Sequence, residues 1–236
     1  EGSSSSTTRG ADVGRIKEIA ETNYQRITRA RHEEVSLPII AFFGISRAVG
    51  GGRVSKKSRP GLGKKIFHEG YQDWEEMRAQ KFHYTEWLAR YDALLLHHKK
   101  EYPGTKEAFF EAVKTANPYI VDIQFHDGEL WIKVNIDGNE SKLLPLTLLS
   151  DGIHYFTAMV AEIAYRCIVL NGYQRESAVQ ETTGIVMIDE IDLHLHPTWQ
   201  RRVVEDLKKA FPKIQFVVTT HSPFIVQSLK SDEVWK

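Results

Sequence analysis

The sequence predicts an α/β protein built on a mostly parallel sheet with flanking helices. A continuous apolar run over residues 184–188 begins at a glycine and leads into two carboxylates, as expected for a fully buried strand of a parallel sheet. A second apolar run covers residues 214–218, and a helical pattern of apolar residues covers 198–210 between them. A strand, a helix of about four turns and a second strand form a right-handed βαβ unit, so both strands should be parallel and end at one edge.

Two carboxylates, Asp189 and Glu190, follow the first strand directly, at the edge where parallel α/β sheets bind ligands. An apolar strand that ends in Asp-Glu has the Walker B pattern of ATPases, in which the Asp holds Mg²⁺ and the Glu polarises the attacking water. His221 follows the second strand, so we expect it to converge on the carboxylates, where it can hydrogen-bond a γ-phosphate. The alternative is a strand that ends in acidic turn residues, with a histidine in an ordinary loop.

A polar turn, Ser150-Asp151-Gly152, precedes a long helix whose apolar residues share one face. A small, glycine-bearing turn at a helix start exposes free N–H groups and the positive end of the helix dipole, which together form an anion site. The Ser150 hydroxyl adds a further donor. The alternative for this turn is an ordinary helix cap.

Residues 184–228 resemble the C-terminal half of an ABC-type ATPase head, in which the Walker B strand is followed by the D-loop and the switch histidine. The stretches DEIDLHLHPTWQ and FPKIQFVVTTHSP are most similar to the stand-alone bacterial ABC-like ATPases, which resemble SMC heads without the long coiled coil. This group includes the ATPase subunits of Septu-type anti-phage systems, retron-associated ATPases and the ATPase part of OLD-family nucleases. Leu-Ser-Asp-Gly at 149–152 matches the ABC signature of this group, although Asp151 replaces the glycine of the transporter form.

The resemblance implies a catalytic role for the residues at the strand ends. Asp189 is expected to bind Mg²⁺, and Glu190 to act as the general base or as the acceptor that orients water. His221 is expected to sense the γ-phosphate of ATP.

The resemblance also implies residues that act between two copies of the head. The signature of one ABC-type head caps the nucleotide held by the P-loop of another, so the 150–152 turn would act in trans. Asp192, in the D-loop, would couple the two sites, and the working state would be a head-to-head dimer closed around two ATP molecules. His194 and His196 lie in the same loop, where we expect them to pack at the interface rather than bind a metal.

The sequence contains no match to the phosphate-binding P-loop, whose pattern is G-x-x-x-x-G-K-[ST]. In the nearest stretch, Ser58 replaces the first glycine and Lys65 replaces the final hydroxyl residue. We therefore expect the P-loop lobe to come from outside this stretch, and the chain to be an excerpt of a longer protein.

The rest of the chain divides into a joining segment and the head. Residues 1–12 are rich in serine and threonine, which is typical of a disordered join. Residues 13–236 are predicted to form a partial ABC-type head, with a helical insertion over 66–117. The head is predicted to begin with an amphipathic helix over 13–33 and a strand over 37–43.

A hairpin is predicted between the insertion and the signature turn. Residues 121–125 and 130–136 alternate between apolar and polar side chains, and the Asp127-Gly128 pair between them is a strong hairpin signal. One face of this antiparallel piece should be solvated.

Two basic features precede these elements. Arg47 follows the first predicted strand and is expected either to approach a phosphate or to lie on a surface loop. Residues 50–65 carry lysines and arginines without any acid, which suits contact with nucleic-acid phosphates but is also typical of a solvated loop.

Composition narrows the class of protein. The formal net charge of the 236 residues is zero, so overall charge says nothing about a polyanionic partner. The single cysteine, Cys167, excludes a disulfide framework and fits a reducing cytoplasm. No apolar run approaches the roughly 20 residues that a membrane span needs, so no membrane partner is expected.

These observations favour a cytoplasmic ATPase whose dimer gates a nuclease or another effector in anti-phage defence. The alternative is a nucleotide-sensing scaffold that binds ATP, hydrolyses little and assembles a partner. A third possibility is an OLD-type fusion, with a nuclease domain after Lys236.

Overall fold

The computed structural model describes residues 35–45, 70–74, 83–96, 102–136 and 138–235. By contacts the chain forms two compact units, 1–36 and 37–236, and every helix and strand given below belongs to the second. The predictions for residues 1–12, for the helix over 13–33, for Arg47 and for the basic stretch 50–65 lie outside the described residues.

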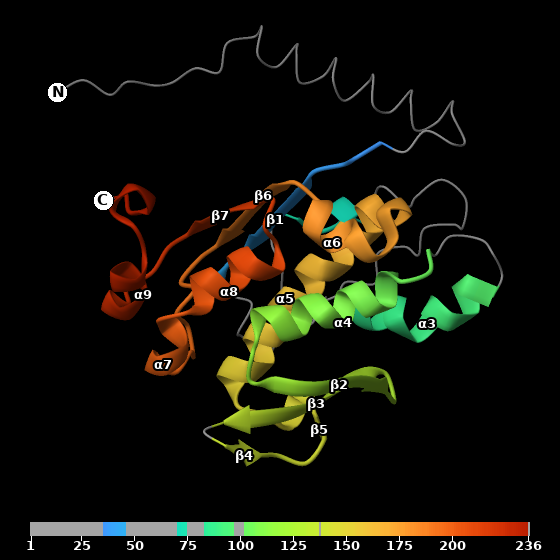
Figure 1. Cartoon of the computed structure of the whole chain (residues 1–236), viewed down its shortest axis with the longest axis horizontal. Helices are drawn as coiled ribbons and strands as arrows, with labels where there is room; N and C mark the ends of the chain where they lie inside the picture. Colours follow the sequence, from blue (N-terminus) through green and yellow to red (C-terminus); the bar gives the residue numbers. More distant parts are fainter. Residues whose placement is uncertain (1–34, 46–69, 75–82, 97–101, 137, 236) are drawn as a thin grey trace, which may run out of the picture. The chain divides into compact units, whose positions relative to one another are not determined.

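The second unit contains strands of two sheets and the helices packed on them (Figure 1). The strands are β1 (Ile39–Phe43), β2 (Ile120–His126), β3 (Glu129–Ile136), β4 (Asn139–Glu140), β5 (Leu144–Pro145), β6 (Gly184–Ile188) and β7 (Ile214–Val218). The α-helices are α3 (Tyr84–Leu96), α4 (Thr105–Ala116), α5 (Asp151–Asn171), α6 (Ala178–Glu181), α7 (Pro197–Gln200), α8 (Val203–Ala210) and α9 (Pro223–Ser228). Short 3₁₀ helices cover Leu146–Leu148, Gly172–Ser177 and Ser231–Glu233.

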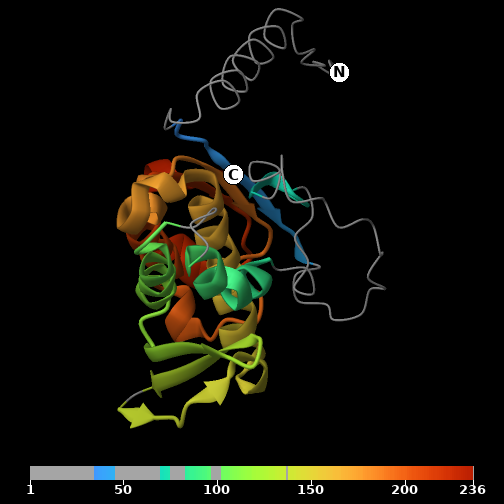
Figure 2. The same ribbon diagram turned by 90° about the vertical axis from the view of Figure 1, so that its right-hand side faces the viewer.

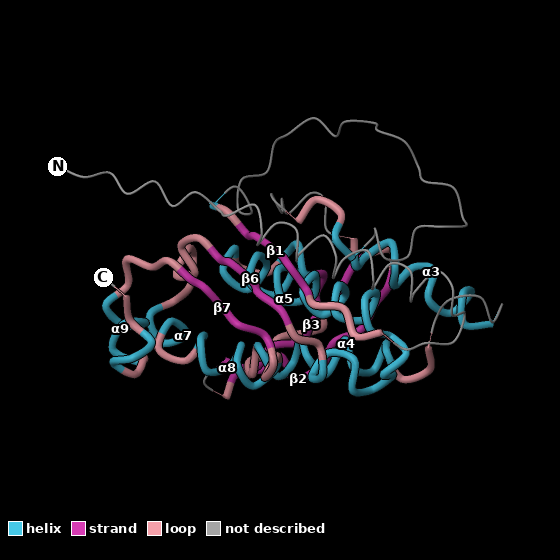
Figure 3. Tube along the Cα trace, turned by 90° about the horizontal axis from the view of Figure 1, so that it is seen from above, coloured by secondary structure: helices cyan, strands magenta, loops and turns pink. Residues whose placement is uncertain are grey.

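The first sheet is parallel, in the order β1-β6-β7, which confirms the predicted pairing of the two apolar strands. Figure 3 shows the three strands side by side, with helices on one side of them. Gly184 begins the central strand with φ 144°, and a Cβ on it would lie 2.1 Å from the Ile39 carbonyl oxygen. A glycine is therefore required where β6 meets β1.

The strand predicted over 37–43 begins two residues later than expected. Leu37 does not join the ladder, because its N–H donates to Asn171 Oδ1 and its carbonyl accepts from Asn171 Nδ2, both at 2.8 Å. The side-chain amide of Asn171, at the end of α5, thus takes the place of a neighbouring strand for this residue.

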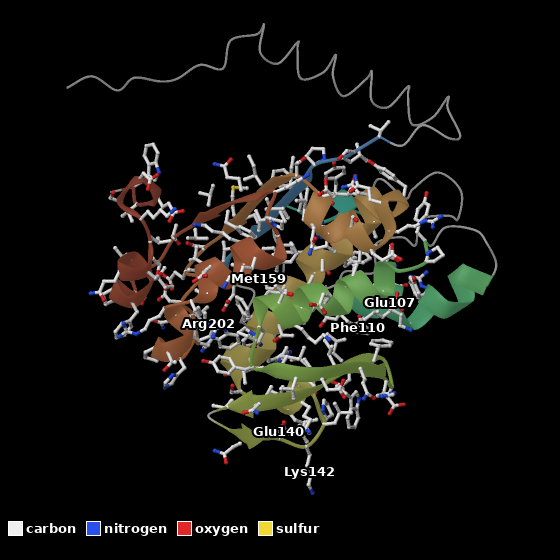
Figure 4. The ribbon with its side chains drawn as sticks, in the orientation of Figure 1. Glu107, Phe110, Glu140, Lys142, Met159 and Arg202 are labelled. Atoms are coloured by element: carbon white, nitrogen blue, oxygen red, sulfur yellow. The ribbon has the colours of Figure 1, made fainter. Side chains whose placement is uncertain are left out.

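The long helix α5 is the centre of the core. It packs against β1, α3 and α4, and nearly all its residues are buried. Met159, one of the buried α5 residues, is labelled in Figure 4. The stretch Asp151–Glu181 is long and apolar enough to cross a membrane, but 83% of its apolar window is buried inside the fold, as in the core helix of a globular domain.

A buried ion pair fixes the chain around α5. Glu162 and Arg166 are both fully buried and 3.1 Å apart. The Glu162 carboxylate accepts hydrogen bonds from the backbone N–H groups of His83 and Tyr84 at the start of α3. The Arg166 guanidinium donates to the carbonyl of Gly70, so polar side chains on α5 hold two segments distant in sequence.

The helix predicted over 198–210 is two helices, α7 and α8, although its apolar residues face the core as expected. Arg202, labelled in Figure 4, departs from helical geometry with φ −126°. Its guanidinium binds the buried carboxylate of Asp206 at 2.7 and 3.2 Å. The ion pair joins Arg202, the residue before α8, to the first turn of that helix.

The second sheet is antiparallel, with β3 between β2 and β4 and with β5 also paired to β3. It lies on the far side of α4 and α5 from the parallel sheet (Figure 2). Asp127 and Gly128 have φ 52° and 82°, as a two-residue hairpin turn requires, so the predicted hairpin is confirmed.

The segment predicted as a helical insertion contains α3 and α4. Before α3, only residues 70–74 of this segment are described. Helix α4 packs against both α5 and α8. The boundaries 66–117 of a separate insertion stay a prediction.

Candidate functional site

The strand ends place three of the predicted side chains at one edge of the parallel sheet. Asp189 and Glu190 follow β6, and His221 lies shortly after β7, the strand paired with it. His221 Nε2 is 3.9 Å from Glu190 Oε1, with side chains 89% and 38% exposed. The carboxylates and the imidazole are therefore close enough to contact one ligand, and that ligand can reach them from solvent.

The backbone of Glu190 is strained. Its φ is 47°, in the left-handed region that residues other than glycine, asparagine and aspartate seldom occupy. Strained residues of this kind persist only where the surrounding structure holds them, and they cluster at functional sites.

The strain arises where the β6–β7 ladder contains an extra residue. Thr219 N–H donates to the Ile188 carbonyl at 3.0 Å, as in a regular parallel ladder. Its carbonyl accepts from Ile191 N–H at 3.0 Å, whereas an uninterrupted ladder would pair it with Glu190 N–H. Glu190 is thus the additional residue of a bulge, a feature that recurs next to active sites and re-aims a side chain.

Thr219 also supplies a side-chain partner to the bulge. Its Oγ1 accepts the Glu190 N–H at 2.8 Å and donates to Asp189 Oδ1 at 2.5 Å. The hydroxyl therefore fixes both the bulged backbone and the carboxylate beside it. Thr219 was not predicted as a site residue, although it directly follows the second apolar strand in the sequence.

The D-loop, residues 191–196, is held by a second threonine. The Thr220 hydroxyl donates to Asp192 Oδ1 and accepts from Ser222 N–H at 3.0 Å. The loop turns on itself, because Leu195 N–H donates to the Asp192 carbonyl at 3.0 Å. His196 caps α7, since its Nδ1 accepts the Thr198 N–H at 3.3 Å, and this role was not predicted.

The signature turn lies against this same loop. Ser150 and Asp151 are exposed, whereas Gly152 is buried at the start of α5. A Cβ on Gly152 would lie 2.3 Å from the carbonyl oxygen of His194. Glycine is therefore needed here for packing, a reason beyond the free N–H groups considered from the sequence. The Ser150 side chain makes no capping hydrogen bond, unlike an ordinary serine cap.

Rings line the junction of the signature turn and the D-loop. His154 stacks on Tyr155, with ring centroids 4.9 Å apart, and Tyr155 lies 5.8 Å from His194. Burial lowers the pKa of His154 below 6.5, although Asp151 and Glu129 oppose the shift. The lowered pKa favours the neutral form of the imidazole.

The residues at the strand edge suit magnesium. Asp189 and Glu190 offer the hard oxygen atoms that Mg²⁺ prefers. Among the described residues there is no group of three or more His, Cys, Asp or Glu side chains able to form a complete metal cage. Mg²⁺ is commonly bound by one or two carboxylates together with water and substrate phosphates, and the donor set at this edge fits that mode.

The α/β fold, the acid pair and histidine at its edge and the signature turn define the class, which is that of the stand-alone ABC-like ATPases of defence systems. The chain belongs to the family described as "AAA domain, putative AbiEii toxin, Type IV TA system", whose model matches residues 69–227. The resemblance inferred from the sequence motifs is confirmed.

Three curated proteins are similar in sequence to parts of this chain. The chain is 44% identical over 100 residues to "Retron Ec83 probable ATPase" of Escherichia coli, a match that covers 42% of this chain and 18% of that protein. It is 44% identical over 86 residues to "Septu protein PtuA" of Bacillus mycoides (strain KBAB4), a match that covers 36% of this chain and 11% of that protein. A second Septu protein PtuA, from Bacillus thuringiensis, is 32% identical over 125 residues, and this match covers 53% of this chain and 28% of that protein. The chain thus spans a minor part of these relatives.

Solved structures with partial similarity include SMC heads. A structure titled "Structural biochemistry of ATP-driven dimerization and DNA stimulated activation of SMC ATPases" aligns with a TM-score of 0.37 at 19% identity, over 53% of this chain and 72% of that one. The "SMC head domain from Thermotoga maritima" aligns with a TM-score of 0.35 at 19% identity, over 54% of this chain and 41% of that one.

Proposed function

We propose that this chain forms the part of an ATP-hydrolysing head that positions the metal and the attacking water. Asp189 holds Mg²⁺, Glu190 accepts the proton of the attacking water or orients it, and His221 hydrogen-bonds the γ-phosphate. When bound, Mg²⁺ neutralises charge on the phosphate oxygens. The observation that carries the proposal is the bulge at the end of β6, which aims a strained Glu190 at the edge shared by Asp189 and His221.

The same proposal gives the signature turn a role in a dimer. Ser150, Asp151 and Gly152 cap the nucleotide of a second copy, while Asp192 couples the two sites. The exposure of Ser150 and Asp151 supports this arrangement, as does the 70% exposure of the neighbouring Leu148, an apolar side chain suited to a partner surface. The P-loop that completes each site comes from outside this stretch.

In its biological setting, the head gates a nuclease or another effector in cytoplasmic anti-phage defence. Support comes from the names of the similar proteins, which belong to retron and Septu systems.

The test replaces Glu190 by glutamine in the complete protein and measures ATP hydrolysis together with ATP binding. Loss of a general base is expected to slow hydrolysis by about 10²–10⁴-fold while binding persists. Glu205→Gln is the matched control, because Glu205 is an exposed acid on α8 whose partner is Lys209. Hydrolysis by Glu190→Gln at the wild-type rate contradicts the proposal, and unchanged phage defence by a hydrolysis-dead variant favours the nucleotide-sensing scaffold.

A further inference from the structure

We propose that Thr219 and Thr220 are positioning residues that hold the two acidic segments of the site, a role that rests on the ATPase function proposed above. They occupy successive positions directly after β7. Thr219 bonds the acid pair that follows β6, and Thr220 bonds Asp192 of the D-loop. The loop that carries His221 is thereby tied to both segments.

Thr219 holds the bulge through three of its polar groups. Its N–H and carbonyl bond Ile188 and Ile191 on either side of the acid pair. Its hydroxyl accepts from Glu190 N–H, the backbone group that the bulge removes from the regular ladder, and donates to Asp189. A hydroxyl is suited to this place because it both accepts and donates, whereas a valine of similar shape does neither.

The bond to Asp189 also limits the orientations available to that carboxylate. Hydrogen bonds from a second residue orient metal-binding carboxylates, and their loss typically weakens metal affinity or activity by about 10–100-fold. Thr219 therefore acts on Mg²⁺ through Asp189, without being placed among the metal ligands itself.

Thr220 connects the same loop to the surface that faces a second copy. Its hydroxyl bonds Asp192, and the D-loop carbonyl of His194 lies against Gly152 of the signature turn. A contiguous path therefore runs from the His221 loop through Thr220 and the D-loop to the signature. Movement of the His221 loop is transmitted to that surface through Thr220.

The test for Thr219 uses the complete protein carrying Glu190→Gln, so that nucleotide is not consumed. Binding of a fluorescent N-methylanthraniloyl ATP is titrated with Mg²⁺ in this background and in the same background with Thr219→Val. The half-saturating Mg²⁺ concentration is expected to rise about 10-fold or more, and Thr219→Ser is expected to restore it. Thr183→Val is the matched control, because Thr183 is an exposed threonine at the opposite end of β6.

The test for Thr220 measures ATP-dependent dimerisation by sedimentation in the same background. Thr220→Val is expected to weaken the dimer while the Mg²⁺ dependence of nucleotide binding stays at its parent value, and Thr220→Ser is expected to restore the dimer. A dimer as strong as the parent's overturns the role assigned to Thr220.

The outcomes separate this inference from the proposed function. If Glu190→Gln still hydrolyses ATP, the proposed function fails. If it stops hydrolysis but Thr219→Val titrates with Mg²⁺ like its parent, the role of Thr219 is wrong while the ATPase proposal stands. Urea denaturation verifies folding, and Thr219→Ala provides a second hydroxyl-free variant if the valine variant does not fold.

Discussion

Replacing Glu190 by glycine is expected to stabilise the fold while it abolishes hydrolysis. The left-handed conformation at φ 47° costs an ordinary L-residue about 1–2 kcal/mol. Glycine avoids this cost, but its greater freedom in the unfolded chain offsets about 0.4–1 kcal/mol of the gain. The difference of these two ranges is centred near a net gain of about 0.8 kcal/mol, which corresponds to a rise in Tm of about 2–3 °C for a domain of this size.

The assay compares Glu190→Gly with Glu190→Gln by urea denaturation and calorimetry of the nucleotide-free protein. Both variants remove the negative charge beside Asp189, so the difference between them reports the relief of backbone strain together with the loss of the rest of the side chain. Asp127→Gly is a further control, because Asp127 also has a positive φ but lies in the hairpin. The free energy of unfolding should rise less in this variant, because aspartate tolerates the left-handed backbone region better than glutamate does. The Asp127→Gly variant should hydrolyse ATP at the wild-type rate. If the glycine variant melts no higher than the glutamine variant, the inference of strain at Glu190 is refuted.

Two other substitutions probe the signature turn and its surroundings. Gly152→Ala places a Cβ 2.3 Å from the His194 carbonyl oxygen and is expected to lower the free energy of unfolding by about 1–3 kcal/mol in urea denaturation, whereas Ser150→Ala, which removes no capping bond, should not. Because the pKa of His154 is lower in the folded protein, the unfolded chain takes up a proton at a higher pH than the folded one does. The free energy of unfolding therefore falls as the pH drops below about 6.5. His154→Gln should reduce this acid-induced loss in melts recorded from pH 7.5 to 5, and an unchanged pH profile would count against the burial assigned to His154.

The elements of the fold were predictable where a local pattern specifies them. The apolar runs of β6 and β7 and the Asp127-Gly128 turn are each specified by residues adjacent in sequence. The start of β1 was not predictable, because it depends on a side-chain contact from a residue distant in sequence. Asn171 satisfies the backbone of Leu37 from 134 positions away. The break between α7 and α8, at Arg202 with φ −126°, has no signal in the apolar pattern of residues 198–210.

In the candidate site, too, a local pattern specifies some features, whereas others depend on a contact from a residue distant in sequence. The pattern of an apolar strand followed by Asp-Glu indicates which carboxylates reach the edge, but not that Glu190 occupies a bulge with a positive φ. That conformation requires an acceptor for the displaced Glu190 N–H, and Thr219, 29 positions further along the chain, supplies it. The same hydroxyl also bonds Asp189, so it links the bulged backbone of Glu190 to the neighbouring carboxylate. Thr219 therefore links the loop that carries His221 to both residues of the acid pair.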